Sequence, residues 1–222
     1  MKPIQKRWEL PPEPDASVYR NLASLPKPIV RVLYHRGIAD AESARMFFQT
    51  DAVPLADPFL FADMSKAVER ILRAVRAGEP LAVYGDYDTD GVTATAMLVD
   101  FLGSIHASVS AYIPSRFEEG YGLNRPALEG LAAQGAKVVI TVDCGARSVG
   151  EAAFARETHL DLIITDHHAP GAEEPPALAF INPKRNGCIY PEKNLSGVGV
   201  AFRLVQALIQ RMGETERMPS ER

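Results

Sequence analysis

Four short apolar segments alternate with helix-like segments through the middle of the chain, and this alternation restricts the possible folds more than any other feature. The apolar segments are residues 81–84, 108–113, 137–142 and 162–165. Short strands that alternate with helices are typical of right-handed β-α-β units, which bring their strands into a mostly parallel sheet. We therefore expect an α/β fold, in which a mostly parallel sheet has flanking helices.

The clearest predicted helix precedes the first strand and covers residues 63–77. Its apolar side chains follow the i, i+3, i+4, i+7 spacing of one helix face, and Gly78 follows as a typical end residue. The opposite face is charged and includes Arg70 and Arg73, and we expect that face to be solvated. Further helices are predicted over residues 92–102, 126–133, 148–157 and 200–212.

The first 57 residues carry no cluster of catalytic residue types. Short helices are predicted over residues 18–25, 28–36 and 41–49. We therefore divide the chain into an N-terminal helical extension, residues 1–57, and a main α/β domain, residues 58–222.

The first predicted strand ends in a turn with aspartates at alternate positions, Asp86, Asp88 and Asp90. Carboxylates crowded together repel one another unless a cation offsets their charge, and hard divalent cations prefer such oxygen ligands. The alternative is an acidic turn with solvated side chains. The metal interpretation is favoured because ligands of open α/β sheets bind beyond the carboxyl ends of the strands.

Two other predicted strands also end in residues that can bind metal. Asp143 follows the third strand, and Asp166, His167 and His168 follow the fourth. Parallel strands end at the same edge of a sheet, so these side chains are expected to converge with the acidic turn. Cys144 lies next to Asp143, and we expect it to be a small packing residue.

A mixed set of carboxylate and imidazole ligands indicates a particular chemistry. Carboxylates suit Mg²⁺ and Mn²⁺, and imidazole shifts the preference toward Mn²⁺ and other transition ions. A pair of such ions can activate water and stabilise both oxygens of an in-line displacement at phosphorus. Phosphoester hydrolysis is therefore the predicted reaction class.

The composition limits the classes of protein to which the chain can belong. With 222 residues and a net charge of −4, the chain can form a sizeable core but is not basic overall, so contacts with nucleic acid must be local. No apolar run reaches the length that spans a bilayer, and residues 1–14 lack the apolar segment of a secretory signal. The two cysteines, Cys144 and Cys188, have no metal-ligand spacing. We therefore expect a cytoplasmic protein with free thiols and no membrane contact.

Three motifs resemble those of a known superfamily. Asp-Tyr-Asp-Thr-Asp-Gly at residues 86–91, Asp-Cys-Gly at 143–145 and Asp-His-His at 166–168 are similar to the first three motifs of the DHH phosphoesterases. The stretches 112–124 and 197–202 further resemble the bacterial RecJ exonucleases within that superfamily. Thr89 replaces the family's usual alanine, and we expect only a minor effect.

The resemblance implies roles for individual residues. Asp88, Asp90, Asp143 and His167 would be ligands of Mn²⁺ or Mg²⁺, with two ions in a complete enzyme. Asp86 and His168 would be ligands or would orient ligands, and His168 would also contact substrate. The implied catalytic residues are Asp88, Asp90, Asp143, His167 and His168.

The resemblance also implies two positions that bind substrate, Arg116 and Gly197. Arg116 would hold a phosphate, for which a rigid guanidinium fork is suited; the alternative is a loop salt bridge to Glu118 or Glu119. Gly197 would open the last helix, where amides can hold a phosphate or a carboxylate. Tight packing against the sheet is the alternative for Gly197.

The implied function is metal-dependent hydrolysis of single-stranded DNA in the 5′ to 3′ direction, in DNA repair and recombination. The implied partners are single-stranded DNA and a single-strand-binding protein or repair helicase. Two alternatives stay open. One is a DHH phosphoesterase that acts on short oligonucleotides or small nucleotides; the other is a RecJ-like scaffold without catalytic activity. A scaffold should have lost ligand positions, and all of those in the three motifs are present.

The family has a further motif after the helix that ends near residue 212, and that motif supplies another aspartate. Residues 213–222 contain glutamates but no aspartate. We therefore expect the chain to correspond to an incomplete, N-terminal part of the enzyme and to be weakly active or inactive by itself.

Overall fold

The computed structural model describes residues 9–49 and 55–217. The chain divides into two compact units, Met1–Leu55 and Ala56–Arg222. The division lies two residues before the boundary expected after residue 57. Parts of the expected N-terminal extension, residues 1–8 and 50–54, lie outside the described residues, as do residues 218–222 of the last polar stretch.

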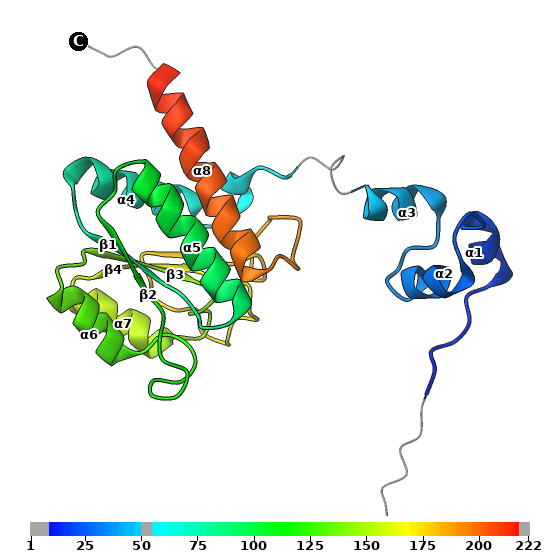
Figure 1. Cartoon of the computed structure of the whole chain (residues 1–222), viewed down its shortest axis with the longest axis horizontal. Coiled ribbons are helices and arrows are strands. Elements are labelled where there is room, and N and C mark those ends of the chain that lie inside the picture. The colour runs from blue at the N-terminus through cyan, green and yellow to red at the C-terminus, as the bar shows by residue number, and fades with distance from the viewer. Residues whose placement is uncertain (1–8, 50–54, 218–222) are drawn as a thin grey trace, which may run out of the picture. The chain divides into compact units, whose positions relative to one another are not determined.

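The first unit contains three short helices, α1 (Ala16–Asn21), α2 (Lys27–Tyr34) and α3 (Ala41–Phe48) (Figure 1). Asp40 caps α3, because its side chain accepts a hydrogen bond from the Ser43 amide at 2.8 Å. A small core of five buried apolar residues joins the helices: Val18, Leu22, Val30, Leu33 and Ala44.

The second unit is built on one five-stranded parallel sheet with the strand order β2-β1-β3-β4-β5. The strands are β1 (Leu81–Tyr84), β2 (Val109–Tyr112), β3 (Val138–Val142), β4 (Asp161–Thr165) and β5 (Ala179–Ile181). The α/β prediction is therefore confirmed. β5 was not predicted from the sequence, because its three residues follow a proline-containing loop and are too few to show a strand pattern.

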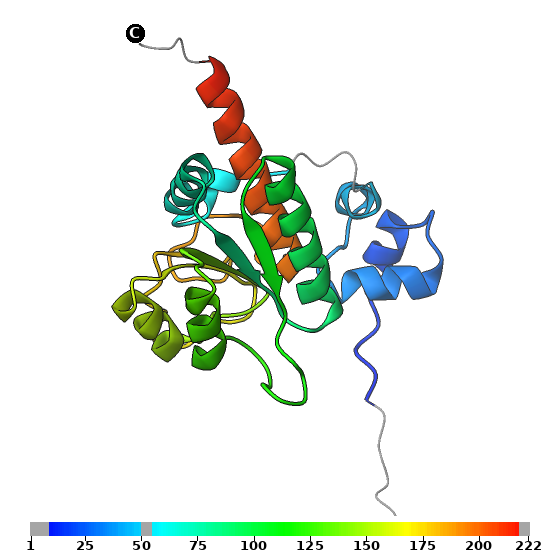
Figure 2. The same cartoon turned by 60° about the vertical axis from the view of Figure 1, so that its left-hand side comes forward.

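Helices cover both faces of this sheet (Figures 1 and 2). Three of them, α4 (Met64–Ala77), α5 (Thr89–Ser104) and α8 (Gly197–Arg217), share one core with alternate strand residues. The other two, α6 (Arg125–Ala133) and α7 (Val149–Glu157), share the core on the opposite face. A 3-10 turn, η2 (Pro58–Leu60), precedes α4. Both faces of the sheet are thus buried, which explains why β1 and β3 consist of buried residues throughout.

None of the helices within the described residues combines the length and the apolar character needed to cross a membrane.

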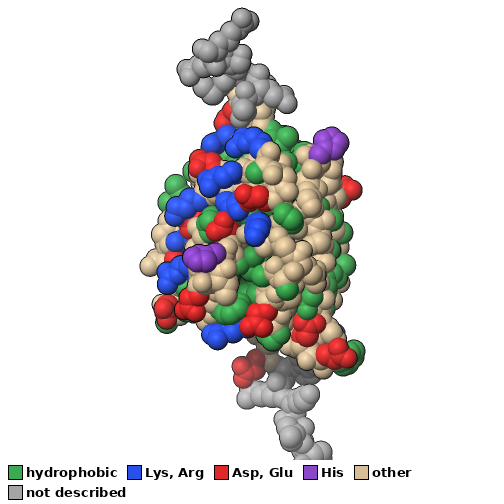
Figure 3. Space-filling model, turned by 90° about the vertical axis from the view of Figure 1, so that its left-hand side faces the viewer, with side chains coloured by type: hydrophobic (Ala, Val, Ile, Leu, Met, Phe, Trp, Pro, Cys, Tyr) green, Lys and Arg blue, Asp and Glu red, His purple; other side chains and the backbone are tan. Residues whose placement is uncertain are grey.

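On the face of the molecule shown in Figure 3, basic and acidic side chains are interspersed. Cys144 is buried in the core shared with α6 and α7, as expected for a packing residue.

The expectation of a solvated charged face on α4 is wrong for one residue, Arg70. Its side chain is only 9% exposed, and its Nε donates to Asp161 at 2.5 Å while its Nη2 donates to Glu79 at 2.6 Å. Asp161 opens β4 and Glu79 precedes β1, so this guanidinium joins α4 to the amino ends of two strands. Periodicity could not show this, because both acids lie far from the helix pattern.

We predict that Arg70→Ala lowers the free energy of unfolding by about 1–3 kcal/mol, because it leaves Asp161 and Glu79 without their shared cation. Urea denaturation at neutral pH measures the loss. The matched control is Arg73→Ala on the exposed face of the same helix, which should cost no more than about 0.5 kcal/mol. Equal losses for the two variants would show that the buried pairing does not stabilise the fold.

Candidate metal centre

Three neighbouring strands bring the predicted site residues to one edge of the sheet. β1, β3 and β4 lie side by side and run in parallel, so their carboxyl ends meet. Two overlapping groups of side chains have ligand atoms within 4.8 Å of one another: Asp86, Asp88 and Asp143, and Asp143, His167 and His168. Asp143 belongs to both groups and is therefore the centre of the site.

The backbone at Asp143 turns its carboxylate into the site. Its φ of 62° lies in the left-handed region, which is unfavourable for a residue with a Cβ and which is typical of functional sites. The residue is 1% exposed. Burial, together with the negative charges of Asp90, Asp88, Asp166 and Asp86, raises the pKa of Asp143 to about 8.

Asp143 faces a second hydrogen-bond acceptor, the imidazole of His167. The Nδ1 of His167 lies 2.8 Å from the carbonyl oxygen of Leu195, and a carbonyl only accepts, so Nδ1 carries the proton. In the neutral ring, Nε2 then presents a lone pair, and this atom lies 3.1 Å from Asp143 Oδ1. Two acceptors at this distance require a cation or a proton between or beside them.

The buried carboxylate oxygens support the same conclusion. Oδ1 of Asp86 and Oδ1 of Asp143 are both buried without a hydrogen-bond donor, which is unfavourable for a carboxylate. Burial, together with the charge of Asp88, raises the pKa of Asp86. A divalent cation would satisfy these oxygens and the lone pair of His167, so the donor set fits Mn²⁺ or Mg²⁺.

Asp88 has a second role as the cap of α5. Its Oδ1 accepts from the amides of Asp90 and Gly91 at 2.8 and 3.0 Å, so α5 begins at Thr89, three residues before the expected start. Gly91 packs against the backbone of Asp86, and a Cβ there would overlap it. The cap and this close approach hold the acidic turn in one conformation.

Asp90 occupies a different place from the other candidate ligands. Its carboxylate accepts from the amides of Gly197 and Val198 at 2.5 and 2.7 Å, at the start of α8. Asp90 Oδ2 lies 3.7 Å from His167 Nε2, so the residue borders the cluster. The Gly197 amide is thus engaged by a carboxylate of the chain itself. Gly197 also packs so tightly on Asp143 that any side chain would overlap the carboxylate.

Asp166 is fully engaged in positioning its neighbours. Its Oδ1 accepts from the His167 amide at 2.7 Å and lies 2.8 Å from His168 Nδ1, and its Oδ2 accepts from the Ala146 amide at 2.7 Å. Asn182, which follows β5, donates to the His168 carbonyl at 2.9 Å. Asn182 was not predicted from the sequence, and neither was β5; the available signal was an asparagine directly after an apolar triplet.

Arg116 lies on the loop between β2 and α6 and contacts Tyr87 of the acidic turn. Its guanidinium carbon lies 4.9 Å from the centre of the Tyr87 ring, and Tyr121 packs edge-on against both Tyr87 and His168. Glu119 accepts from the Tyr112 hydroxyl and the Ser115 amide instead of pairing with Arg116. Within the described residues, Arg116 forms no ion pair with Glu118 or Glu119.

A hollow with a volume of about 610 Å³ opens beside His168. Its lining includes one arginine, Arg147, and two acids, Glu151 and Asp166, together with Tyr121. The buried acidic cluster therefore adjoins an open hollow of mixed charge, which leaves room for a phosphate ester.

We predict that Asp143→Asn stabilises the metal-free chain, and that the gain grows as the pH rises from about 4 to about 8. A carboxyl whose pKa is raised on folding keeps a proton that the unfolded chain has released, so wild-type stability falls through this window. Asparagine does not ionise and escapes this loss. Urea denaturation in EDTA at pH 4.5 and pH 8.5 measures the difference.

The control for this titration is Asp100→Asn, an exposed position on α5. Its effect on the free energy of unfolding should be small and the same at both pH values. A pH-independent effect of Asp143→Asn would show that Asp143 titrates normally in the folded chain.

Comparisons with known proteins agree with this geometry. Residues 80–221 match the family described as DHH family, N-terminal domain. The chain is 44% identical over 206 residues to the single-stranded-DNA-specific exonuclease RecJ of Bacillus subtilis (strain 168), covering 91% of this chain and 26% of that protein. It is 40% identical to the RecJ exonuclease of Escherichia coli (strain K12), covering 84% and 32%. The chain therefore spans only a quarter to a third of the length of these relatives.

Solved structures show the same fold. An exonuclease RecJ bound to manganese matches with a TM-score of 0.63 and 35% identity, over 72% of this chain and 39% of the other. RecJ of Thermus thermophilus in complex with Mn²⁺ matches with a TM-score of 0.67 and 30% identity, over 93% and 28%. A third structure contains RecJ of the same organism with Mg²⁺.

Proposed function

The chain belongs to the DHH family, whose N-terminal domain it matches over residues 80–221, and from this premise we propose that its site hydrolyses phosphodiester bonds of single-stranded DNA with Mn²⁺ or Mg²⁺. The observation that most supports this proposal is the distance of 3.1 Å between two hydrogen-bond acceptors, Asp143 Oδ1 and His167 Nε2, at the centre of the acidic cluster.

The proposed ligands form two groups that share Asp143. Asp86 and Asp88 would join Asp143 on one side, and His167 would join it on the other, with His168 within the same group. Asp90, which lies 3.7 Å from His167, is proposed as a further ligand once it leaves the α8 amides. Because the two groups of ligands share Asp143, each group could hold one ion of a pair. Bound ions would polarise a phosphoryl oxygen and lower the pKa of a water that attacks phosphorus.

The chain's own residues would position the substrate and handle protons. Asp166 fixes the His168 ring through Nδ1. Nε2 of this half-exposed ring lies 3.4 Å from the Tyr121 hydroxyl, and it would hold a proton at a phosphate oxygen that takes the place of this weak contact. Arg116, placed over Tyr87, would bind a second phosphate through its rigid fork. The Gly197 amide already donates a hydrogen bond to Asp90. Gly197 would therefore act on substrate only indirectly, because its lack of a side chain allows α8 to approach Asp143.

The relatives favour this function over the two alternatives. Several are named single-stranded-DNA-specific exonuclease, at 36–44% identity over 68–91% of this chain, which supports a DNA strand as substrate rather than a small nucleotide. The candidate ligands of the three motifs are all present in the sequence. Their retention argues against a scaffold without activity.

We also propose the finer points that the resemblance implies. These are degradation in the 5′ to 3′ direction, a cytoplasmic role in DNA repair and recombination, and a single-strand-binding protein or repair helicase as partner. Residues 1–57 would form an N-terminal extension to a DHH domain of residues 58–222. The similarity to the named exonucleases supports these proposals.

We predict that the chain releases nucleotides from a 5′-labelled single-stranded 30-mer with Mn²⁺ or Mg²⁺, and that EDTA stops the release. Asp88→Asn and Asp143→Asn should lower the rate at least about 100-fold, because each removes a proposed ligand from a shared cluster. Gel or chromatographic analysis of the products measures the rate.

Asp100→Asn is the matched control and should keep the wild-type rate, since this exposed residue lies on α5 away from its capped end. The results are ratios between variants, metals and substrates, so a low absolute rate does not affect the comparison. The same rate in EDTA, or on blunt duplex DNA, would contradict the proposed function.

A further inference from the structure

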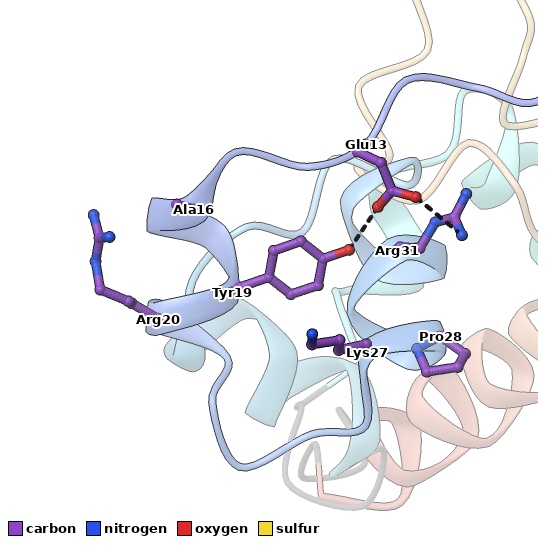
Figure 4. A pocket seen from close by; sticks show the side chains of 7 residues that line it. All are labelled: Glu13, Ala16, Tyr19, Arg20, Lys27, Pro28 and Arg31. Carbon is purple, nitrogen blue, oxygen red and sulfur yellow. Dashed lines mark hydrogen bonds and ion pairs between the residues drawn. The ribbon is translucent and has the colours of Figure 1, made fainter.

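The first unit contains a hollow that is separate from the candidate metal centre. It has a volume of about 670 Å³ and lies between α1 and α2 (Figure 4). Its lining includes one acidic, one aromatic and three basic residues: Glu13, Tyr19, Arg20, Lys27 and Arg31. We call this feature the α1–α2 hollow.

The only acidic residue in that lining is already engaged. Glu13 accepts a hydrogen bond from the Tyr19 hydroxyl at 2.8 Å through Oε2, and its Oε1 pairs with Arg31 at 3.1 Å (Figure 4). Both carboxylate oxygens are thus used. The charges of Glu13 and Arg31 therefore offset each other.

Two cations of the lining are left without an acidic partner. Arg20 on α1 and Lys27 at the start of α2 are both exposed, and within the described residues neither forms an ion pair. They are the surplus positive charge of the α1–α2 hollow. An anionic ligand would provide the missing partners.

Positive charge is in excess in the lining of the hollow, which has three basic residues against one acidic residue. Over the described residues of the first unit, 9–49, basic and acidic residues number five each, so the excess belongs to the hollow and not to the unit as a whole. A polyanion that approaches an acidic protein is attracted where positive charge gathers.

Tyr19 decides between two kinds of polyanion. Its ring lines the hollow, and its hydroxyl bond to Glu13 holds the ring in place between the helices (Figure 4). Cations next to an aromatic ring are the combination that binds single-stranded nucleic acid, where phosphates meet the charges and a base meets the ring. An acidic peptide has no group that requires the ring.

We propose that the α1–α2 hollow binds a stretch of single-stranded DNA, with Arg20 and Lys27 contacting phosphates and Tyr19 contacting a base. The choice of DNA rests on the proposed function. The hollow would be a second contact for the strand, distinct from the residues that act on the phosphodiester bond.

The test is binding of the 222-residue chain to a fluorescently labelled oligo-dT 20-mer, followed by anisotropy in EDTA so that no turnover occurs. The double variant Arg20→Glu/Lys27→Glu should bind at least about tenfold more weakly. The slope of its log affinity against log salt concentration should be less negative by about 1.4, which is the contribution of two phosphate contacts to a single strand. The neutral variant Arg20→Gln/Lys27→Gln should show a smaller loss in the same direction.

The matched control is Arg36→Glu/Arg45→Glu, which makes the same change in charge at exposed positions of the same unit outside the hollow. It should weaken binding less than about threefold. Tyr19→Leu should weaken binding about tenfold at every salt concentration, because it removes a stacking contact but no charge.

Three results would overturn the proposal: no binding by the wild-type chain, equal losses in the two charge-reversal variants, or equally strong competition by a poly-glutamate peptide. The last result would identify an acidic peptide as the ligand. Because this assay measures binding without metal, its failure is separate from the failure of the proposed function, which is measured by turnover.

Discussion

One unfavourable arrangement dominates the second unit: carboxyl groups and an imidazole crowd around Asp143 at the edge of the sheet. Asp143 Oδ1 is buried without a donor and faces Nε2 of His167 at 3.1 Å, and Asp86 Oδ1 is buried without a donor nearby. The folded chain opposes this repulsion with its core and by holding a proton on Asp143, whose pKa is raised to about 8. A divalent cation removes the conflict, which is why the site suits metal-dependent chemistry.

Several features of the fold serve to hold these groups together. The parallel order of β1, β3 and β4 places three strand ends side by side. Asp88 is at once a candidate ligand and the cap of α5, and the start of α8 binds Asp90 while its Gly197 packs on Asp143. Two of the helices on one face of the sheet, α5 and α8, are therefore anchored by residues of the site. A change in ligation and a change at the start of α8 are expected to affect each other.

Much of this could be predicted from the sequence, for reasons that the structure makes clear. Apolar runs and the spacing of the acidic turn are local signals, so β1, β3 and the meeting of Asp86, Asp88 and Asp143 followed from them. Features that depend on distant partners could not be predicted. Arg70 is buried because Asp161 and Glu79 lie beside it, and Asn182 reaches His168 from a strand of three residues. The hydrogen bond from the Gly197 amide of α8 to Asp90 likewise joins residues that are 107 positions apart in the sequence.

The most direct test of the metal centre is a titration with Mn²⁺ in which free Mn²⁺ is followed by electron paramagnetic resonance. The account predicts saturable binding by the wild-type chain and at least about tenfold weaker binding by Asp143→Asn, because both groups of candidate ligands share this residue. Glu129→Gln, on α6 and away from the cluster, should bind as the wild type does. Absence of saturable binding, or equal affinity for Mn²⁺ in all three proteins, would contradict the account.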